Sequence, residues 1–197
     1  DRSPSRGLGD VYKRQMNCTT PANYFHALRR QMHRDFRKPL IIMTPKSLLR
    51  HKHCVSNLSD FSKQNTFHRV LWDHAIDPKL KGFIKLKKKE KIKKIILCSG
   101  KIYFDLLEAR EKLKRDDLVF YRIEQLYPFP VKSLVKELKP YAKNGKFYWC
   151  QEEPKNMGAW FSVRDYIQWT LDNIKANNKE ISYIGRSPDA SPATGYA

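Results

Sequence analysis

The sequence predicts an α/β fold: a mostly parallel five-stranded sheet flanked by helices. Five short apolar runs, largely β-branched or aromatic, indicate buried strands at residues 40–44, 95–98, 118–123, 147–150 and 181–184. Apolar residues at helical spacing lie between the later runs, within 103–113, 131–138 and 160–171. Strands that alternate with helices form βαβ crossovers, which build a mostly parallel sheet with helices on both faces.

The first elements are read in chain order. Residues 1–15 have no apolar periodicity and resemble translated adapter sequence, so we treat them as a non-native or disordered leader. Residues 16–38 hold a helix, because Thr20 is a hydroxyl cap and Pro21 suits the first helical position. An apolar stripe is expected along it, and Pro39 closes it. The stripe consists of Tyr24 or Phe25, Leu28, Met32 and Phe36.

Two later segments break the rhythm of strands and helices. Residues 50–94 are polar and basic, and we interpret them as a long excursion from the sheet; eight lysines and one glutamate fall between positions 81 and 94. Residues 187–197, with two prolines and small residues, are expected to be extended.

Composition limits the class of protein. A chain of 197 residues with 41% aliphatic and aromatic residues can bury one core. Its longest apolar runs are far shorter than the roughly 20 residues that span a bilayer, so no membrane helix is predicted. Four cysteines without paired spacing favour a reducing compartment.

The net charge of +19 raises the hypothesis of a standalone basic module that binds nucleic acid or an acidic partner. No helix-turn-helix or paired stacking aromatics accompany the lysine run, so nucleic-acid binding is not favoured. A basic docking face for an acidic protein fits the charge equally well.

Polar residues at strand ends are the candidate site. Ligands of open α/β sheets bind at the carboxyl edge, where Ser99 and Lys101 follow one strand and Gln151 follows another. Ser99-Gly100-Lys101 fits phosphate binding and a plain tight turn about equally. Glu152 and Glu153 are adjacent and point to opposite faces, which favours hydrogen bonding or subunit contact over joint acid/base catalysis.

Six blocks, in order, carry a family resemblance: residues 17–31, 37–50, 98–103, 122–130, 151–154 and 190–195. They resemble the C-terminal end of the thiamine diphosphate-dependent first component of the 2-oxoglutarate dehydrogenase complex, over residues 16–197. The resemblance implies a transketolase C-terminal-domain-like fold. It places residues 16–38 at the end of a pyrimidine-binding-type domain and 39–186 in the C-terminal domain, with 187–197 a truncated tail.

The resemblance also implies a function. Relatives form homodimers, decarboxylate 2-oxoglutarate in the tricarboxylic acid cycle, and pass the succinyl group to the lipoyl-bearing succinyltransferase component. Thiamine diphosphate and magnesium would bind outside these residues, so the isolated chain is expected to be inactive. The enzyme would be cytoplasmic in a bacterium, which we favour, or in the mitochondrial matrix of a eukaryote.

Specific residues follow from the same resemblance. His26 matches a histidine of the substrate pocket, where an imidazolium would neutralise a carboxylate or relay a proton. An allosteric nucleotide, acetyl-CoA or AMP, is expected at Thr44, Ser99, Lys101 and Gln151, which would share one sheet edge and one pocket. No metal ligands are predicted.

Overall fold

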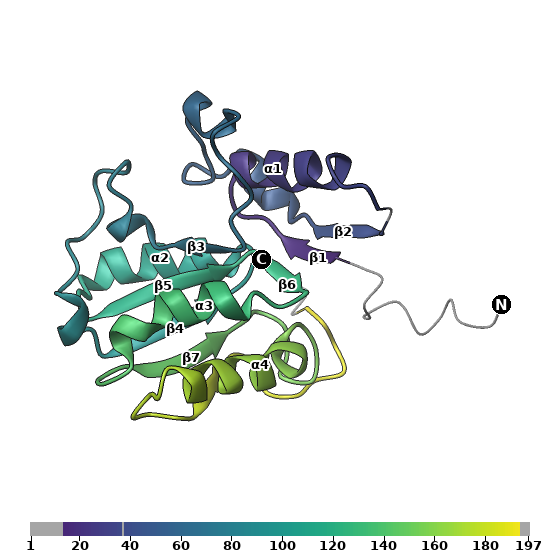
Figure 1. The fold of residues 1–197 in the computed structure, drawn as a ribbon. Helices are drawn as coiled ribbons and strands as arrows, with labels where there is room; N and C mark the ends of the chain where they lie inside the picture. The colour runs from purple at the N-terminus through teal and green to yellow at the C-terminus, as the bar shows by residue number, and fades with distance from the viewer. Residues whose placement is uncertain (1–13, 37, 194–197) are drawn as a thin grey trace.

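A computed structural model describes residues 14–36 and 38–193 of the chain (Figure 1). The strands and helices, in chain order, are β1 (Arg14–Asn17), α1 (Pro21–Met32), β2 (Leu40–Met43), β3 (Val70–Trp72), β4 (Lys94–Cys98), α2 (Ile102–Leu113), β5 (Leu118–Ile123), β6 (Gln125–Tyr127), α3 (Val131–Leu138), β7 (Lys146–Cys150), α4 (Trp160–Asn173) and β8 (Ile181–Ile184). Short 3₁₀ helices lie at Lys46–Arg50, Leu58–Phe61, His74–Ile76, Lys89–Lys91 and Lys139–Tyr141.

The larger sheet confirms the predicted fold class. It has five strands in the order β3-β5-β4-β7-β8, and all pairs are parallel except β3 with β5. Apolar residues of α2 pack with one side of the sheet, and those of α3 and α4 pack with the other. Every residue of β5 is buried, because this strand has neighbours on both edges and helices on both faces.

A second sheet has three strands in the order β2-β1-β6 and carries α1 (Figure 1). Its small core contains Met16, Ala27 and Phe67. The chain passes from the larger sheet to the smaller at Glu124, the single residue between β5 and β6. Sequence-distant segments therefore meet where the two sheets join.

Strand assignment required two corrections. The run at 40–44 does form a strand, but β2 pairs with β1 in the smaller sheet and does not join the larger one. The fifth strand of the larger sheet is β3, which lies inside the segment 50–94 that we interpreted as an excursion. Strand β3 has three residues and lies in polar sequence, so its pattern is too short to predict a strand. Its antiparallel pairing with β5 depends on residues about 50 positions later in the chain.

The last two positions of the predicted leader are part of the fold. Arg14 and Gln15 belong to β1 and pair with Leu40 and Ile41 of β2. Residues 1–13 lie outside the described residues, as do positions 194–197 of the predicted extended tail.

Helix α1 begins as predicted, since the Thr20 side chain accepts a hydrogen bond from Asn23 N. It ends at Met32, well before Pro39. The expected apolar stripe is not its buried face: Leu28 is 45% exposed and Met32 78% exposed. The buried face includes Asn23 and His26 instead: Asn23 Nδ2 donates to the buried Glu124 carboxylate, and His26 Nε2 donates to the Asp60 carbonyl.

Candidate functional site

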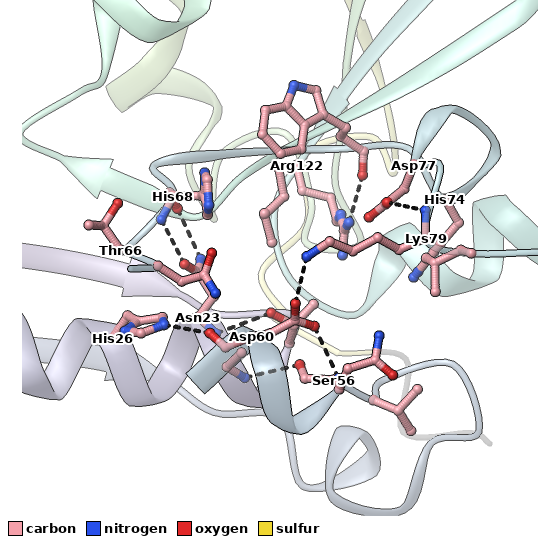
Figure 2. A pocket seen from close by; sticks show the side chains of 18 residues that line it. Asn23, His26, Ser56, Asp60, Thr66, His68, His74, Asp77, Lys79 and Arg122 are labelled. Carbon is pink, nitrogen blue, oxygen red and sulfur yellow. Dashed lines mark hydrogen bonds and ion pairs between the residues drawn. The ribbon is translucent and has the colours of Figure 1, made fainter. Parts of the chain in front are cut away.

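A cavity of about 340 Å³ lies between α1, the segment 55–80 and the end of β5 (Figure 2). Its lining combines carboxylate, imidazole, ammonium and guanidinium groups with apolar side chains such as Leu71 and Leu80. Its charged and imidazole-bearing lining residues are His26, Asp60, His68, His74, Asp77, Lys79 and Arg122. Such a set suits a small anionic or polar ligand.

His26 lines this cavity from α1 and is 3% exposed. Its Nε2 lies 2.7 Å from the carbonyl oxygen of Asp60, so Nε2 carries a proton and donates. The other ring nitrogen, Nδ1, is buried and has no hydrogen-bond partner among the described residues. In the neutral ring Nδ1 is an acceptor, and only after gaining a proton could it donate to a carboxylate.

The cavity has two cationic side chains, Lys79 and Arg122, which differ in how many of their donors have partners. Lys79 forms an ion pair of 2.8 Å with Asp60, and their hydrogen bond lowers the pKa of the Asp60 carboxyl and raises the pKa of Lys79. Arg122 donates to Thr19 Oγ1 at 3.0 Å and to the Trp72 carbonyl at 2.6 Å, yet its buried Nε has no partner in the described part of the chain. Arg122 Nε and His26 Nδ1 are thus two unfilled hydrogen-bonding positions on lining residues.

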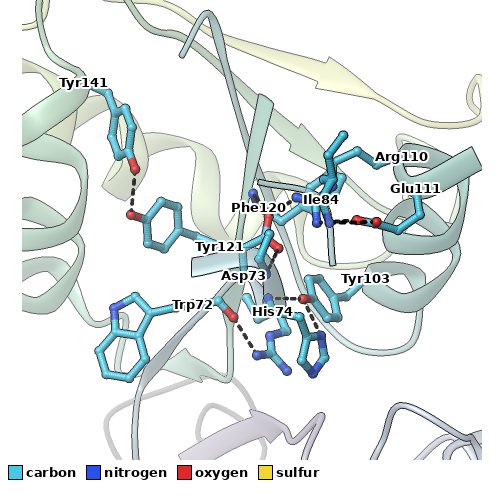
Figure 3. A network of polar contacts seen from close by, with 12 residues as sticks. Trp72, Asp73, His74, Ile84, Tyr103, Arg110, Glu111, Phe120, Tyr121 and Tyr141 are labelled. Atoms are coloured by element: carbon cyan, nitrogen blue, oxygen red, sulfur yellow. Dashed lines mark hydrogen bonds and ion pairs between the residues drawn. The ribbon is translucent and has the colours of Figure 1, made fainter. Parts of the chain in front are cut away.

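A polar network surrounds His74, one of the residues that line the cavity (Figure 3). The Tyr103 hydroxyl accepts from the backbone N–H of His74 and donates to its Nδ1 at 2.7 Å. Burial, with positive groups nearby, lowers the pKa of His74 to about 3, so its ring is neutral at pH 7. Beside it, Asp73 pairs with Arg110, and both side chains are almost fully buried.

Glu124 locks the junction of the two sheets. It is fully buried and accepts hydrogen bonds from Thr19 N and Asn23 Nδ2, each at 2.9 Å. Burial raises the pKa of the Glu124 carboxyl, although Arg122 and these donors act in the opposite direction. Because Asn23 also bonds to the backbone of His68, Glu124 fixes α1 against the cavity wall.

A second cavity, of about 380 Å³, lies at the carboxyl ends of β4 and β7, where sequence reasoning placed the nucleotide. Ser99 and Gln151 line it, together with residues of the smaller sheet. The complete lining is Gln15, Asn17, Met43, Ser99, Leu126, Tyr127, Trp149, Gln151, Glu153, Gly158, Ala159 and Ser162.

The other two predicted nucleotide residues are not in that lining. Thr44 follows β2 in the smaller sheet, is exposed, and its hydroxyl donates to the Ile42 carbonyl at 3.2 Å. Lys101 forms an ion pair with Glu152. Two of the four predicted residues therefore line this cavity, and Thr44 follows a strand of the smaller sheet and not of the larger one; the nucleotide site itself stays a prediction.

Gln151 has no free hydrogen-bonding capacity. Its Oε1 accepts from Trp149 Nε1 at 2.9 Å and from the backbone of residues 159 and 160. Its Nε2 donates to three carbonyls between residues 153 and 157. Gly158, with φ of +67°, comes so close that a Cβ would lie 2.7 Å from Gln151 Nε2. The amide therefore builds the turn before α4.

Sequence reasoning missed Asn23, Lys79, Arg122 and Glu124, which the fold brings to the first cavity or its wall. One signal was available: Arg122 lies near the end of the predicted buried strand, and Glu124 follows that strand directly. Buried charges need partners. Their partners Thr19 and Asn23 lie about a hundred positions earlier, so sequence alone did not pair them.

Two family models match the sequence in consecutive parts. The family model described as transketolase, pyrimidine binding domain matches residues 14–52, and that described as 2-oxoglutarate dehydrogenase C-terminal matches residues 55–197. The 2-oxoglutarate dehydrogenase E1 components of Brucella abortus strain S19 and Brucella anthropi are each 58% identical over 179 residues, 91% of the chain.

The chain belongs to the 2-oxoglutarate dehydrogenase E1 family. The E1 component of Brucella ovis is similar at 57% identity over the same length. The chain spans 18% of the length of each of these E1 components and corresponds to their C-terminal part. The division of domains at residue 38 stays a prediction. No helix within the described residues is long and apolar enough to cross a membrane.

Proposed function

We propose that the chain works as the C-terminal part of a longer E1 component that oxidatively decarboxylates 2-oxoglutarate and passes the succinyl group to a lipoyl-bearing partner. The supporting observation is the 58% identity to E1 components across 91% of the chain. Bacterial relatives favour a cytoplasmic enzyme in a bacterium.

Thiamine diphosphate would supply the electron sink for decarboxylation, and we place it and magnesium outside residues 16–197. Within the described residues, no three His, Cys, Asp or Glu side chains gather in a way that could hold a metal ion. The chain alone, supplied with thiamine diphosphate, magnesium and 2-oxoglutarate, is expected to release no carbon dioxide. Measurable release would contradict the proposal, whereas the full-length E1 serves as the active control.

His26 is proposed to contact 2-oxoglutarate through Nδ1, since that atom is buried, lacks a partner and belongs to a cavity-lining residue. In the full-length E1, His26→Ala should raise KM for 2-oxoglutarate roughly tenfold, the effect of losing one hydrogen bond of about 1.4 kcal/mol. His33→Ala, an exposed residue just after the same helix, is the control. Unchanged KM and kcat in His26→Ala would remove this role and leave His26 as a structural partner of Asp60.

The second cavity is proposed to take an effector nucleotide, acetyl-CoA or AMP, with Ser99 in its lining and Lys101 two positions further along the chain. Lys101 would exchange Glu152 for a phosphate. Calorimetric titration of the chain at roughly 0.15 M salt, where loose attraction is screened, should give saturable binding. Lys101→Ala should lose it, and Lys63→Ala should not. Duplex DNA as a third titrant tests the basic-module hypothesis, and tight DNA binding without nucleotide heat would favour that module.

The exposed apolar stripe on α1 is proposed to lie in the homodimer interface. Phe25, Leu28 and Met32 are 40%, 45% and 78% exposed, and apolar stripes on helices are usually covered. In full-length E1, Leu28→Asp should shift sedimentation toward monomer. Leu113→Asp, an exposed apolar position on α2, is the control. An unchanged dimer in Leu28→Asp would remove the stripe from the interface.

A further inference from the structure

Seven exposed lysines gather where two parallel strands of the larger sheet begin. We call them the lysine patch, and none of them lines either of the two cavities described above. They come from residues 88–94 and 143–146 and are Lys88, Lys89, Lys91, Lys93, Lys94, Lys143 and Lys146. The proposed function leaves this patch unexplained.

Backbone contacts hold the two segments side by side. Lys94 and Lys146 are the first residues of β4 and β7, and they are register partners in these neighbouring parallel strands. The N–H of Lys146 donates to the Lys93 carbonyl at 2.9 Å, and Asn144 Nδ2 donates to the Glu90 carbonyl at 3.0 Å. The fold therefore brings together lysines that lie about fifty positions apart in the chain.

Both segments are also anchored to the rest of the domain. Ile92 is 2% exposed and belongs to the core of the larger sheet. Asn177 Nδ2 donates to the Lys143 carbonyl at 3.0 Å, and Asn178 Nδ2 donates to the Gly145 carbonyl at 2.8 Å. The backbone that carries the lysines is thus ordered before any partner arrives, which lowers the entropy lost on binding.

The patch carries positive charge that the described residues do not neutralise. None of its seven lysines lies within ion-pair distance of a carboxylate in residues 14–36 and 38–193. Asp116 and Asp117, which precede the adjacent β5, are already paired with Lys87 and Arg115. The register partners at the starts of β4 and β7 are both lysines, and like charges facing each other on neighbouring strands repel.

A hollow of about 430 Å³ continues the patch across the starts of β7 and β8. Its polar lining residues include Lys146, Asn177, Asn178, Lys179 and Glu180. A carboxylate side chain that enters this hollow would meet ammonium donors from two different segments.

The mixture of charges favours an acidic protein over a nucleic acid. Glu90 lies within the lysine run and Glu180 lines the hollow, and both would repel a continuous phosphate backbone. Residues 88–94 and 143–146 include no aromatic residue on which a base could stack. Every cation of the patch is a lysine, a flexible point charge that does not need the bidentate geometry of an arginine–phosphate pair.

We propose that the lysine patch, with the hollow beside it, is a docking surface for an acidic protein segment rich in aspartate and glutamate. Charge complementarity selects this occupant, because the ammonium groups of the patch have no carboxylate partners among the described residues. The patch lies where β4 and β7 begin, away from the smaller sheet (Figure 1), so a docked partner leaves both cavities open. The proposal does not depend on decarboxylation of 2-oxoglutarate.

Fluorescence anisotropy of a labelled ten-residue glutamate peptide, titrated with the 197-residue chain at roughly 0.15 M salt, tests the proposal. Saturable binding that weakens as salt rises is expected. Lys94→Gln/Lys146→Gln should weaken it roughly fivefold, because each exposed charge pair contributes modestly and two are removed. Lys63→Gln/Lys132→Gln is the matched control, since it removes the same charge from exposed positions outside the patch.

Urea unfolding of both double variants separates binding from folding. Removing the repulsion between Lys94 and Lys146 should leave the urea midpoint unchanged or higher, so weaker binding would not reflect a loss of fold. A single-stranded DNA of ten nucleotides with the same label tests the other class of partner. The proposal is overturned if the peptide does not bind saturably, if the two double variants bind it equally, or if the DNA binds more tightly than the peptide.

Discussion

Replacing Gln151 by Ala should destabilise the chain strongly. The side chain is 5% exposed and makes hydrogen bonds through both Oε1 and Nε2. Two of the groups that donate to Oε1, Trp149 Nε1 and Trp160 N, belong to buried residues and would stay out of reach of water in the variant. Each unsatisfied buried donor costs about 1–3 kcal/mol, so the loss should be roughly 2–6 kcal/mol.

Urea unfolding followed by tryptophan fluorescence measures this loss as a lower midpoint at unchanged slope. Gln64→Ala is the matched control, because Gln64 is exposed and surface truncations usually change stability by less than about 0.5 kcal/mol. A Gln151→Ala chain that loses less than about 1 kcal/mol would refute the structural assignment. Gln151 would then be free to serve a ligand, as the sequence analysis expected.

Two further predictions concern the network around His74. Arg110→Ala leaves Asp73 buried without its cation, so the free energy of unfolding should fall by about 3–5 kcal/mol in urea, and a loss no larger than that of Arg50→Ala would contradict it. The pKa of His74 is about 3 in the folded chain, below its unfolded value, so protonation of this ring opposes folding. The neutral ring contributes its full free energy to folding above about pH 6.5, and that contribution is lost as the pH falls toward 3. Between pH 7 and pH 5 the wild type should lose about 1–2 kcal/mol more than His74→Gln, whereas His33→Gln should follow the wild type.

The sequence by itself determined the strands that are locally self-evident. The run at 118–123 became β5 with the predicted bounds, and the run at 181–184 became β8. Both segments are rich in β-branched and aromatic residues, and the first is buried along its whole length. The start of α1 was predicted by an equally local signal, since the Thr20 hydroxyl accepts a hydrogen bond from the backbone N–H three residues later.

The family also followed from sequence, because the six ordered blocks of similar residues can be recognised without knowing the fold. The matches to E1 components over 91% of the chain confirm it. Which residue plays which part did not follow. Gln151 and Lys101 stand where a ligand contact is expected, yet one is saturated by its own turn and the other is paired with Glu152.

Only the tertiary structure decided which strands pair and which polar groups meet. Strand β2 joined β1, and β3 joined β5, because pairing depends on partners far away in the chain. The same long-range closure brought Glu124 to Asn23 across 101 positions and turned His26 inward. A buried charge needs a partner, and the fold brings that partner from a distant segment, so the local pattern of apolar residues cannot predict it.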